Sequence, residues 1–430
     1  MKSEHFVLAA VSLLLMSCSS DVINEPPVQL GEERVHVTNL FSSNRSLDEI
    51  HSFAMDATGY LTTGNTSRSD MKREIDKERG IKCITKGVSR AEASTDTLIY
   101  IVNYKDNAGF AVISARRSAE PILAVVGKGS YDSVVKSGNT GFNLFMNMAT
   151  DYVSQCPEES PYSTLGIDDP LEIQELKRVE YVLADDTISP RVKVQWGQGG
   201  FYGSEFDNKI AGCANVASAM IMSYFEHPKS IELKHKTPAT ILELDWNNMK
   251  RHKSGPYVTC CQPNPPHDTI ALLMREIGKR SKSNDSNPDG TSTYTSNMRN
   301  TLKGLGYNVG VMTDFTSGCI VKNLRDENSI IAIRGDRLSD ETSDSNDQYI
   351  GHMWIADGYI YKKIQVIEYV RPVSSQEWTE IQNATNETYM NHFNWGSDGY
   401  GDDYYNDRVF CNKYNKRDYK YNVQFFTVKL

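Results

Sequence analysis

A cysteine at the start of an apolar segment is the feature that most constrains this chain. Cys213 follows Ala211-Gly212 and opens an apolar run that continues to Phe225, where His227-Pro228 ends it. The apolar positions recur at helical spacing: Val216, Ala217, Met220, Ile221 and Tyr224. In the first turn of a helix, unpaired backbone N–H groups and the helix dipole favour thiolate over thiol. The position predicts a reactive sulfur on a buried helix.

Two later motifs supply the groups that a cysteine nucleophile requires. His352 lies in Gly351-His352-Met353-Trp354, a strand-like run that ends at the turn Asp357-Gly358. It is the candidate base and acid, and Asn394 is the candidate that orients its ring. The indole of Trp395 could then screen the His-Asn hydrogen bond from water. The set predicts a thiol peptidase.

An oxyanion donor is also expected near the cysteine. Gln198 lies fifteen positions before Cys213, and its side-chain amide could act together with the Cys213 backbone N–H. Gln195 is the alternative for this role, and we favour Gln198.

Length and charge narrow the classes of protein further. A chain of 430 residues is too long to fold around one small hydrophobic core, which favours two domains. Hydrophobic residues make up 39% and charged residues 23%, as in ordinary globular proteins. The net charge of -9 and the absence of a Lys/Arg-rich stripe argue against a nucleic-acid partner.

The N-terminus reads as a targeting segment. The apolar stretch from Phe6 to Met16 is too short to span a bilayer. It ends in Leu15-Met16-Ser17-Cys18, which resembles the lipobox of bacterial lipoproteins. The resemblance implies a signal peptide over residues 1–17, a lipid on Cys18 and no other attachment to a membrane. The expected location is the outer membrane or cell surface, from which the mature enzyme could be released; a plain secretory signal is the alternative.

The rest of the chain divides at a polar stretch between residues 156 and 190. Before it we expect a tether over 18–45, a helix over 47–60, a loop over 61–96, strands at 98–104, 110–114 and 121–126, and a helix from Phe142 to Tyr152. These make an N-terminal domain over 46–185. The candidate site residues all lie in a second domain over 190–430.

The ordered motifs resemble those of the streptopain-like C10 cysteine peptidases. The matching segments are Trp196-Gly197-Gln198, Gly212-Cys213, Gly351-His352 and Asn394-Trp395-Gly396. The resemblance implies an α+β chain in which a papain-like peptidase domain follows an α+β propeptide domain. It also implies endopeptidase activity on protein or peptide substrates, with a hydrophobic side chain preferred two positions before the cut. Residues 98–126 resemble the family propeptide, which covers the active site of the zymogen as an inhibitor, and no cofactor is implied.

The chain departs from the family pattern after His352. Asn394 follows by forty-two positions, and residues 359–369 look like an extended hairpin arm inserted between them. The segment 398–407 is unusually acidic. Calcium binding and a solvated loop are the alternatives for it, and the loop is favoured because the spacing does not fit an EF-hand. The eight cysteines show no metal-binding spacing, so we expect no metal and no essential disulfide.

Two other functions would use the same residues. One is a catalytically silent surface lipoprotein that uses the papain-like scaffold for binding. The other is a Cys/His/Asn amidase or acyltransferase.

Overall fold

The computed structural model describes residues 28–36, 42–62, 73–78, 81–85, 97–159, 173–252, 266–325, 328–337, 351–372, 377–411 and 421–430. The signal peptide and Cys18 therefore lie outside the described residues, as do Cys260 and Cys261. No helix among the described residues is long and apolar enough to cross a membrane.

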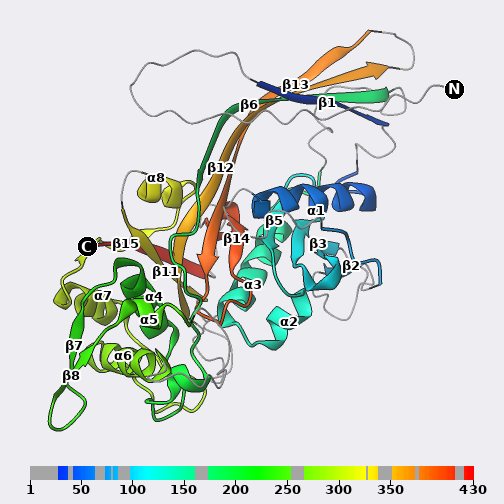
Figure 1. Ribbon diagram of the computed structural model, residues 1–430. Helices are drawn as coiled ribbons and strands as arrows, with labels where there is room; N and C mark the ends of the chain where they lie inside the picture. The colour runs from blue at the N-terminus through cyan, green and yellow to red at the C-terminus, as the bar shows by residue number, and fades with distance from the viewer. Residues whose placement is uncertain are drawn as a thin grey trace, which may run out of the picture.

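The N-terminal half folds around a small antiparallel sheet flanked by helices (Figure 1). Its elements are β1 (Val28–His36), α1 (Leu47–Thr62), β2 (Ile81–Thr85), β3 (Thr97–Asn103), η1 (Lys105–Asn107), β4 (Phe110–Ser114), β5 (Ile122–Val126), α2 (Tyr131–Lys136), α3 (Thr140–Gln155) and β6 (Ile173–Ile188). The residues from α1 through α3 are called the prodomain below.

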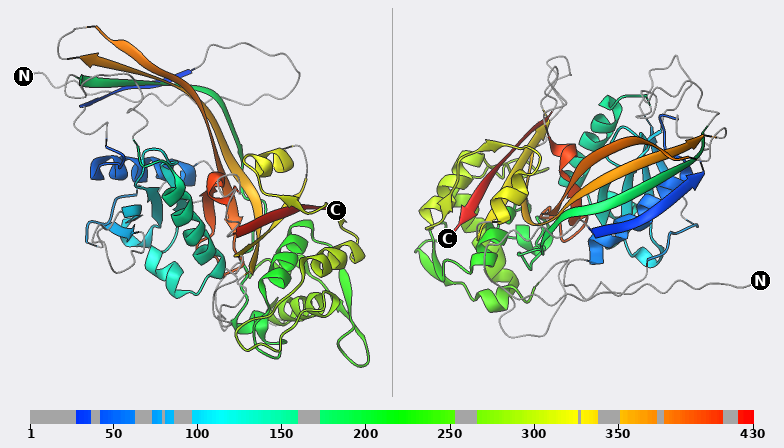
Figure 2. Two further views of the ribbon diagram at one scale, coloured as in Figure 1. Left: turned by 180° about the vertical axis from the view of Figure 1, so that it is seen from behind. Right: turned by 90° about the horizontal axis from the view of Figure 1, so that it is seen from above.

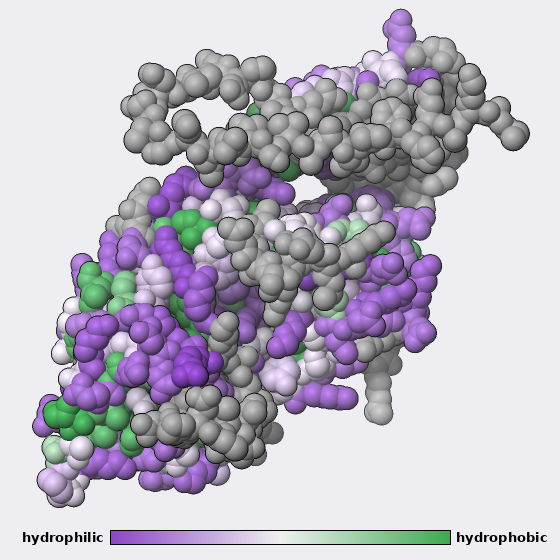
Figure 3. All heavy atoms as spheres, viewed as in Figure 1, coloured by the Kyte–Doolittle hydropathy of each residue, from purple (hydrophilic) through white to green (hydrophobic). Residues whose placement is uncertain are grey.

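The C-terminal half begins with a helical layer and ends in a sheet. Its elements are η3 (Gly200–Gly203), α4 (Cys213–Phe225), β7 (Ser230–Leu233), β8 (Thr240–Glu243), α5 (Trp246–Met249), α6 (Pro266–Arg280), α7 (Thr295–Gly304), β9 (Asn308–Val309), β10 (Thr313–Asp314), α8 (Cys319–Arg325), β11 (Ile330–Arg337), β12 (Gly351–Pro372), β13 (Thr379–Asn394), β14 (Asp403–Asn406), η4 (Asp407–Phe410) and β15 (Tyr421–Lys429). Figure 3 shows that one face is largely hydrophilic, with small apolar patches.

Local sequence explains the main helices. In α3 the side chain of Asn139 accepts a hydrogen bond from the Phe142 backbone N–H at 3.0 Å and caps the helix. Its apolar residues recur on one face and enter the core. Helix α4 is buried on nearly all sides, consistent with its almost uninterrupted apolar sequence. The expected helices at 47–60, 142–152 and 214–225 are confirmed, and so are the three strands between 98 and 126.

The two halves share one sheet within the described residues. Strand β14 of the C-terminal half pairs with β5 of the prodomain, with Tyr404 opposite Val125 and Tyr405 opposite Ala124. The strand order is β10-β15-β11-β12-β13-β14-β5-β4-β3-β2. The shared sheet fixes α3 against the C-terminal half.

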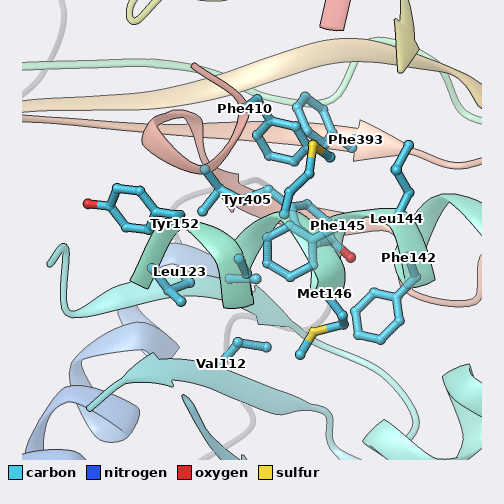
Figure 4. Packing of buried hydrophobic residues seen from close by; sticks show 14 of the residues in the cluster. Val112, Leu123, Phe142, Leu144, Phe145, Met146, Tyr152, Phe393, Tyr405 and Phe410 are labelled. Carbon is cyan, nitrogen blue, oxygen red and sulfur yellow. The ribbon is translucent and has the colours of Figure 1, made fainter. Parts of the chain in front are cut away.

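A common hydrophobic core lies under this junction. Phe145 of α3 packs edge-on against Tyr405, with ring centroids 4.7 Å apart, and stacks on Phe410 at 5.9 Å. Figure 4 shows Phe142 and Phe145 from the prodomain beside Phe393, Tyr405 and Phe410. Burial of aromatic side chains of this size dominates the energetics of such contacts, so the prodomain is part of the folded molecule rather than a loose leader.

Four long strands extend from the body as an arm. It consists of β1, β6 and the distal parts of β12 and β13, which lie side by side in the order β1-β6-β12-β13 (Figure 2). The hairpin arm expected over 359–369 is confirmed, and it is longer, because β12 continues to Pro372 and β13 begins at Thr379.

Three segments expected to lack regular structure contain strands. The loop predicted over 61–96 is wrong at 81–85, which forms β2 and pairs with β3. Residues 28–36, placed in the tether, form β1, and residues 173–188 of the polar stretch form β6. Strands β1 and β6 are polar and are stabilised by pairing with strands distant in the sequence, whereas β2 is a short strand within a polar segment. The domain limits themselves stay predictions.

Candidate active site

Cys213 lies at the first turn of α4, as its sequence context predicts. Gly212 caps the helix with a φ of 85°. A Cβ there would lie 2.7 Å from the Thr291 carbonyl oxygen, so only glycine fits. The sulfur accepts hydrogen bonds from the backbone N–H groups of Met353, Ala214 and Cys213 itself. The Met353 contact places it against the backbone of β12, one residue after His352.

The Cys213 sulfur is a thiol in this form of the protein. Burial raises the pKa of Cys213, and this effect outweighs the backbone N–H donors, which lower it. Thiolate character therefore has to come from a neighbouring positive charge.

The ring of His352 does not provide that charge in this structure. Its Nε2 donates to the Trp395 carbonyl oxygen at 2.9 Å, and its Nδ1 accepts from the Thr140 hydroxyl at 2.9 Å. The Trp395 carbonyl can only accept, so Nε2 carries a proton, and in the neutral ring Nδ1 is then the acceptor. Burial lowers the pKa of His352 to about 4, although the Trp395 carbonyl works in the opposite direction. The base predicted from the sequence is present but uncharged.

Thr140 and its neighbours belong to the prodomain, and they close the site at the start of α3. Gly141 fits against the ring of His352 and the indole of Trp395. A Cβ at Gly141 would lie 2.4 Å from Trp395 Cε3 and 2.5 Å from His352 Cδ2. Asn139 Nδ2 also donates to the Tyr400 carbonyl oxygen at 2.7 Å. The first residues of one prodomain helix thus hold both the imidazole and the loop beside it.

Sequence reasoning missed Thr140 and Gly141. The signal that could have found them is the capped helix start at Asn139-Thr140-Gly141. The residue types carry no catalytic signature.

Asn394 lies near His352 in the sheet but does not bond to its ring here. Its backbone is opposite Ile355 of β12. Its Nδ2 donates to the Val194 carbonyl oxygen at 2.8 Å, and its Oδ1 accepts from the Gly396 backbone N–H at 3.2 Å. The carbonyl of Trp395 takes the place expected for Asn394. The orienting role of Asn394 stays a prediction for the protein without its prodomain.

Trp395 is fully buried beside His352, with ring centroids 6.2 Å apart. Its indole N–H donates to the Gly401 carbonyl oxygen at 3.1 Å, and its backbone N–H donates to Asp402 at 2.9 Å. The Asp402 carboxyl is also buried, which raises its pKa to about 7. Trp354 also stacks near the His352 ring, at 6.2 Å, and its ring lies 4.9 Å from that of Trp395. Aromatic side chains therefore keep water from the imidazole.

The two glutamines considered for the oxyanion site differ in position. The Gln198 carbonyl oxygen accepts from the Ala211 backbone N–H at 2.8 Å, which ties it to the segment just before Cys213. The Gln195 side chain instead lies against Gly399, where a Cβ would be 2.7 Å from its Oε1. The first contact is made by a backbone carbonyl and does not test the side-chain amide, so the role of Gln198 stays a prediction.

The acidic segment 398–407 has its carboxylates engaged separately. Asp402 bonds Trp395, Asp403 accepts from the Gly127 backbone N–H at 2.7 Å, and Asp407 accepts from the Gly318 backbone N–H at 2.6 Å. Among the residues that the structure describes, no group of three or more His, Cys, Asp or Glu side chains could hold a metal ion. The cysteines described, at positions 83, 156, 213, 319 and 411, carry free thiols.

Comparison with protein families identifies the class of protein to which this site belongs. Residues 196–405, which include Gln198, Cys213, His352, Asn394 and Trp395, match the model of the Peptidase C10 family, and residues 56–153 match that of the Spi protease inhibitor. The chain therefore contains a Peptidase C10 family domain, and an inhibitor-type propeptide domain precedes it. The predicted family and the predicted fold class, a papain-like peptidase domain behind an α+β propeptide domain, are confirmed.

Among solved structures, a mutant fragment of Prevotella intermedia prointerpain A is similar to this chain. The identity is 17%, the TM-score is 0.45, and the alignment covers 81% of this chain and 98% of that chain. No curated protein sequence matches the chain.

Proposed function

We propose that this chain is the latent form of a cysteine endopeptidase in which Cys213 and His352 form the catalytic pair. Cys213 attacks the scissile carbonyl carbon and His352 protonates the leaving amine, which gives an acyl-enzyme that water hydrolyses. Gln198 and the Cys213 backbone N–H stabilise the oxyanion, and Asn394 orients the imidazole once it is free.

The observation that carries this proposal is the engagement of both ring nitrogens of His352. Nε2 is bound to Trp395 of the peptidase half, and Nδ1 is bound to Thr140 of the prodomain. Nδ1 is the nitrogen left to face a sulfur, and the prodomain hydroxyl occupies it. With a neutral imidazole and a protonated thiol, the pair lacks the charges that nucleophilic attack requires.

Removal of α3 would reverse both conditions. Water would reach the ring, so the desolvation that lowers its pKa would fall. An imidazolium beside the sulfur would then stabilise the thiolate. The aromatic surface of Tyr405 and Phe410 would also lose Phe145, leaving an apolar site suited to hydrophobic substrate side chains. A hydrophobic preference two positions before the cut follows from this surface as part of the proposal.

Self-processing of the purified zymogen tests the function. We expect the wild-type chain to shorten in reducing buffer and then to cleave casein, while Cys213→Ala stays full-length. Cys213→Ser is the matched variant, since it keeps a nucleophile of lower reactivity and should process far more slowly. If the wild-type and Cys213→Ala chains behave alike, the protein is a binding module. Acyl transfer to an added amine without peptide cleavage would instead indicate an acyltransferase.

The location is proposed separately. The segment 15–18 supports export with a lipid on Cys18. Metabolic labelling with a fatty acid should mark the wild-type chain and not Cys18→Ala. Labelling of neither chain would favour a plain secretory signal.

A further inference from the structure

Strand β6 connects the prodomain to the peptidase half, and it is built into the arm. It pairs antiparallel with β12 from Ile173 opposite Pro372 to Ile188 opposite Tyr359. Its other edge pairs with β1 from Glu175 to Val182. For much of its length β6 is therefore an inner strand, with backbone hydrogen bonds on both sides (Figure 2).

Side chains reinforce this pairing. Val179 is buried, and Lys177 Nζ lies 4.6 Å from the ring centroid of Tyr369. At the base of the arm, Asp186 accepts hydrogen bonds from Arg325 Nε at 2.7 Å and from the Tyr359 hydroxyl at 2.8 Å. These partners belong to α8 and β12 of the peptidase half.

The residues after β6 are fixed to the same elements. Arg191 donates to the carbonyl oxygens of Ser329 at 2.7 Å and Leu324 at 2.9 Å. The Val192 backbone N–H donates to Asp357 Oδ2 at 2.7 Å, and that carboxylate also contacts His392. From Ile173 to Val194 the chain is therefore anchored to the peptidase half.

The anchors to the prodomain end earlier in the sequence. Ser118 Oγ donates to the Pro157 carbonyl oxygen at 2.6 Å, and Arg116 pairs with Glu158 at 2.8 Å. A protease needs an extended, accessible segment, so a bond inside a paired strand is cut only after that strand opens. Cleavage within β6 would require separation from β12 and loss of the contacts at its base.

We propose that the activating cut falls N-terminal to Ile173, so that β6 stays in the mature peptidase as a strand of the arm. This inference rests on the proposed zymogen function, and it places the start of the mature chain earlier than the predicted limit at residue 190. Retained β6 braces β12, the strand that carries His352, through the contact between Asp186 and Tyr359.

Two measurements test the proposal. First, the intact mass of the self-processed wild-type product should give an N-terminus at or before residue 173. Second, Cys213→Ala zymogen is digested with thermolysin, which cuts before aliphatic residues and needs no activity of the chain itself. The segment offers such residues throughout: Leu176, Val179, Val182, Leu183, Ile188, Val192 and Val194. We expect these bonds to survive while the prodomain is degraded.

A matched pair of variants in the Cys213→Ala background controls for accessibility. Val179→Asp puts a charge at a buried position of β6 and should speed cleavage within the strand at least tenfold. Leu183 is 41% exposed and lies at a bulge between Val182 and Ala184, so Leu183→Asp should leave the protection unchanged.

The outcomes separate this inference from the proposed function. If the wild-type chain does not process itself, the proposed function fails, and the thermolysin map still decides whether β6 is protected. A mature N-terminus between residues 174 and 194, or early thermolysin cuts there in the Cys213→Ala chain, would overturn the inference.

Discussion

Thr140 is the side chain through which the prodomain reaches the candidate base. Its hydroxyl donates to Nδ1 of a buried imidazole ring. A buried acceptor that loses its donor is destabilised by about 1–3 kcal/mol. Latency should therefore depend on this one hydroxyl group.

Thr140→Val removes the hydroxyl and keeps the shape of the side chain. We expect self-processing to accelerate about tenfold, which corresponds to about 1.4 kcal/mol, because the imidazole is no longer held. Thr140→Ser keeps the donor and should process at the wild-type rate. Time courses of full-length zymogen in reducing buffer measure both variants, and equal rates for all three chains would refute the role of Thr140.

Gly141 acts at the same place by having no side chain. Gly141→Ala forces a Cβ against His352 and Trp395, and such overpacking costs about 1–3 kcal/mol. We expect a lower melting temperature and faster activation. Gly59→Ala is the control, because an added Cβ at this position in α1 meets nothing within 4 Å. That variant should gain up to about 1 kcal/mol from helix propensity. A Gly141→Ala zymogen as latent and stable as the wild type would contradict the packing argument.

The lowered pKa of His352 predicts the effect of acid. An unfolded chain binds a proton on this ring near pH 6.5, whereas the folded zymogen does so only near pH 4. The contribution of neutral His352 to stability is thus complete above pH 6.5 and is lost as the pH falls toward 4. Asp402, whose pKa is raised to about 7, acts in the opposite sense and stabilises the fold as the pH falls. Unfolding curves of the whole protein would report the summed pH dependence of His352 and Asp402 and would not separate their contributions.

A residue-specific titration separates the two groups. Histidine-edited NMR of the Cys213→Ala zymogen should show His352 neutral, with its proton on Nε2, down to about pH 5. A His352→Gln spectrum assigns the signal. A midpoint near pH 6.5 would contradict a buried, hydrogen-bonded ring.

At the scale of elements, the start of α3 is where helix formation and inhibition are coupled. Asn139 caps the helix and also bonds the Tyr400 carbonyl of the peptidase half. Asn139→Ala should cost about 0.5–2 kcal/mol for the cap and should also release Tyr400. We expect both a lower melting temperature and faster self-processing.

Ser130→Ala is the matched control for that variant. Ser130 caps α2 within the prodomain, and its side chain accepts from the Ser133 backbone N–H. It should lower the melting temperature by a comparable amount with little effect on the processing rate. If both variants activate the zymogen equally, helix stability alone explains latency.

Much of the element structure was predictable from the sequence, and the exceptions share one cause. Amphipathic spacing identified α1, α3 and α4, and apolar runs identified β3, β4 and β5. The polar strands β1 and β6 were missed, because pairing with distant segments determines them, and β2 was missed because it is short and lies in a polar segment. Cys213 and His352 were predicted as the catalytic pair from their motifs, and that role stays a prediction. Thr140 was not predicted, because its importance arises only where α3 meets β12.

At the scale of the whole molecule, prodomain and peptidase share one sheet and one hydrophobic core within the described residues. Strand β5 continues the peptidase sheet at β14, and the aromatic core crosses the same boundary. Asn406 Nδ2 donates to the Ile122 carbonyl oxygen at 3.3 Å, and Asp403 accepts from Gly127. The local sequence of neither half predicts this shared sheet, because its paired strands β5 and β14 lie far apart along the chain. Latency is therefore a property of the assembled fold.

The central claim is that the prodomain withholds the imidazole from the Cys213 thiol. It is tested most directly by the rate at which iodoacetamide alkylates Cys213 at pH 6, followed by peptide mass spectrometry before and after prodomain removal. We predict slow alkylation in the zymogen, where the thiol pKa is raised, an increase of at least a hundredfold after removal, and loss of that increase in His352→Ala. An alkylation rate unchanged by prodomain removal, or an increase that persists in His352→Ala, would contradict the account.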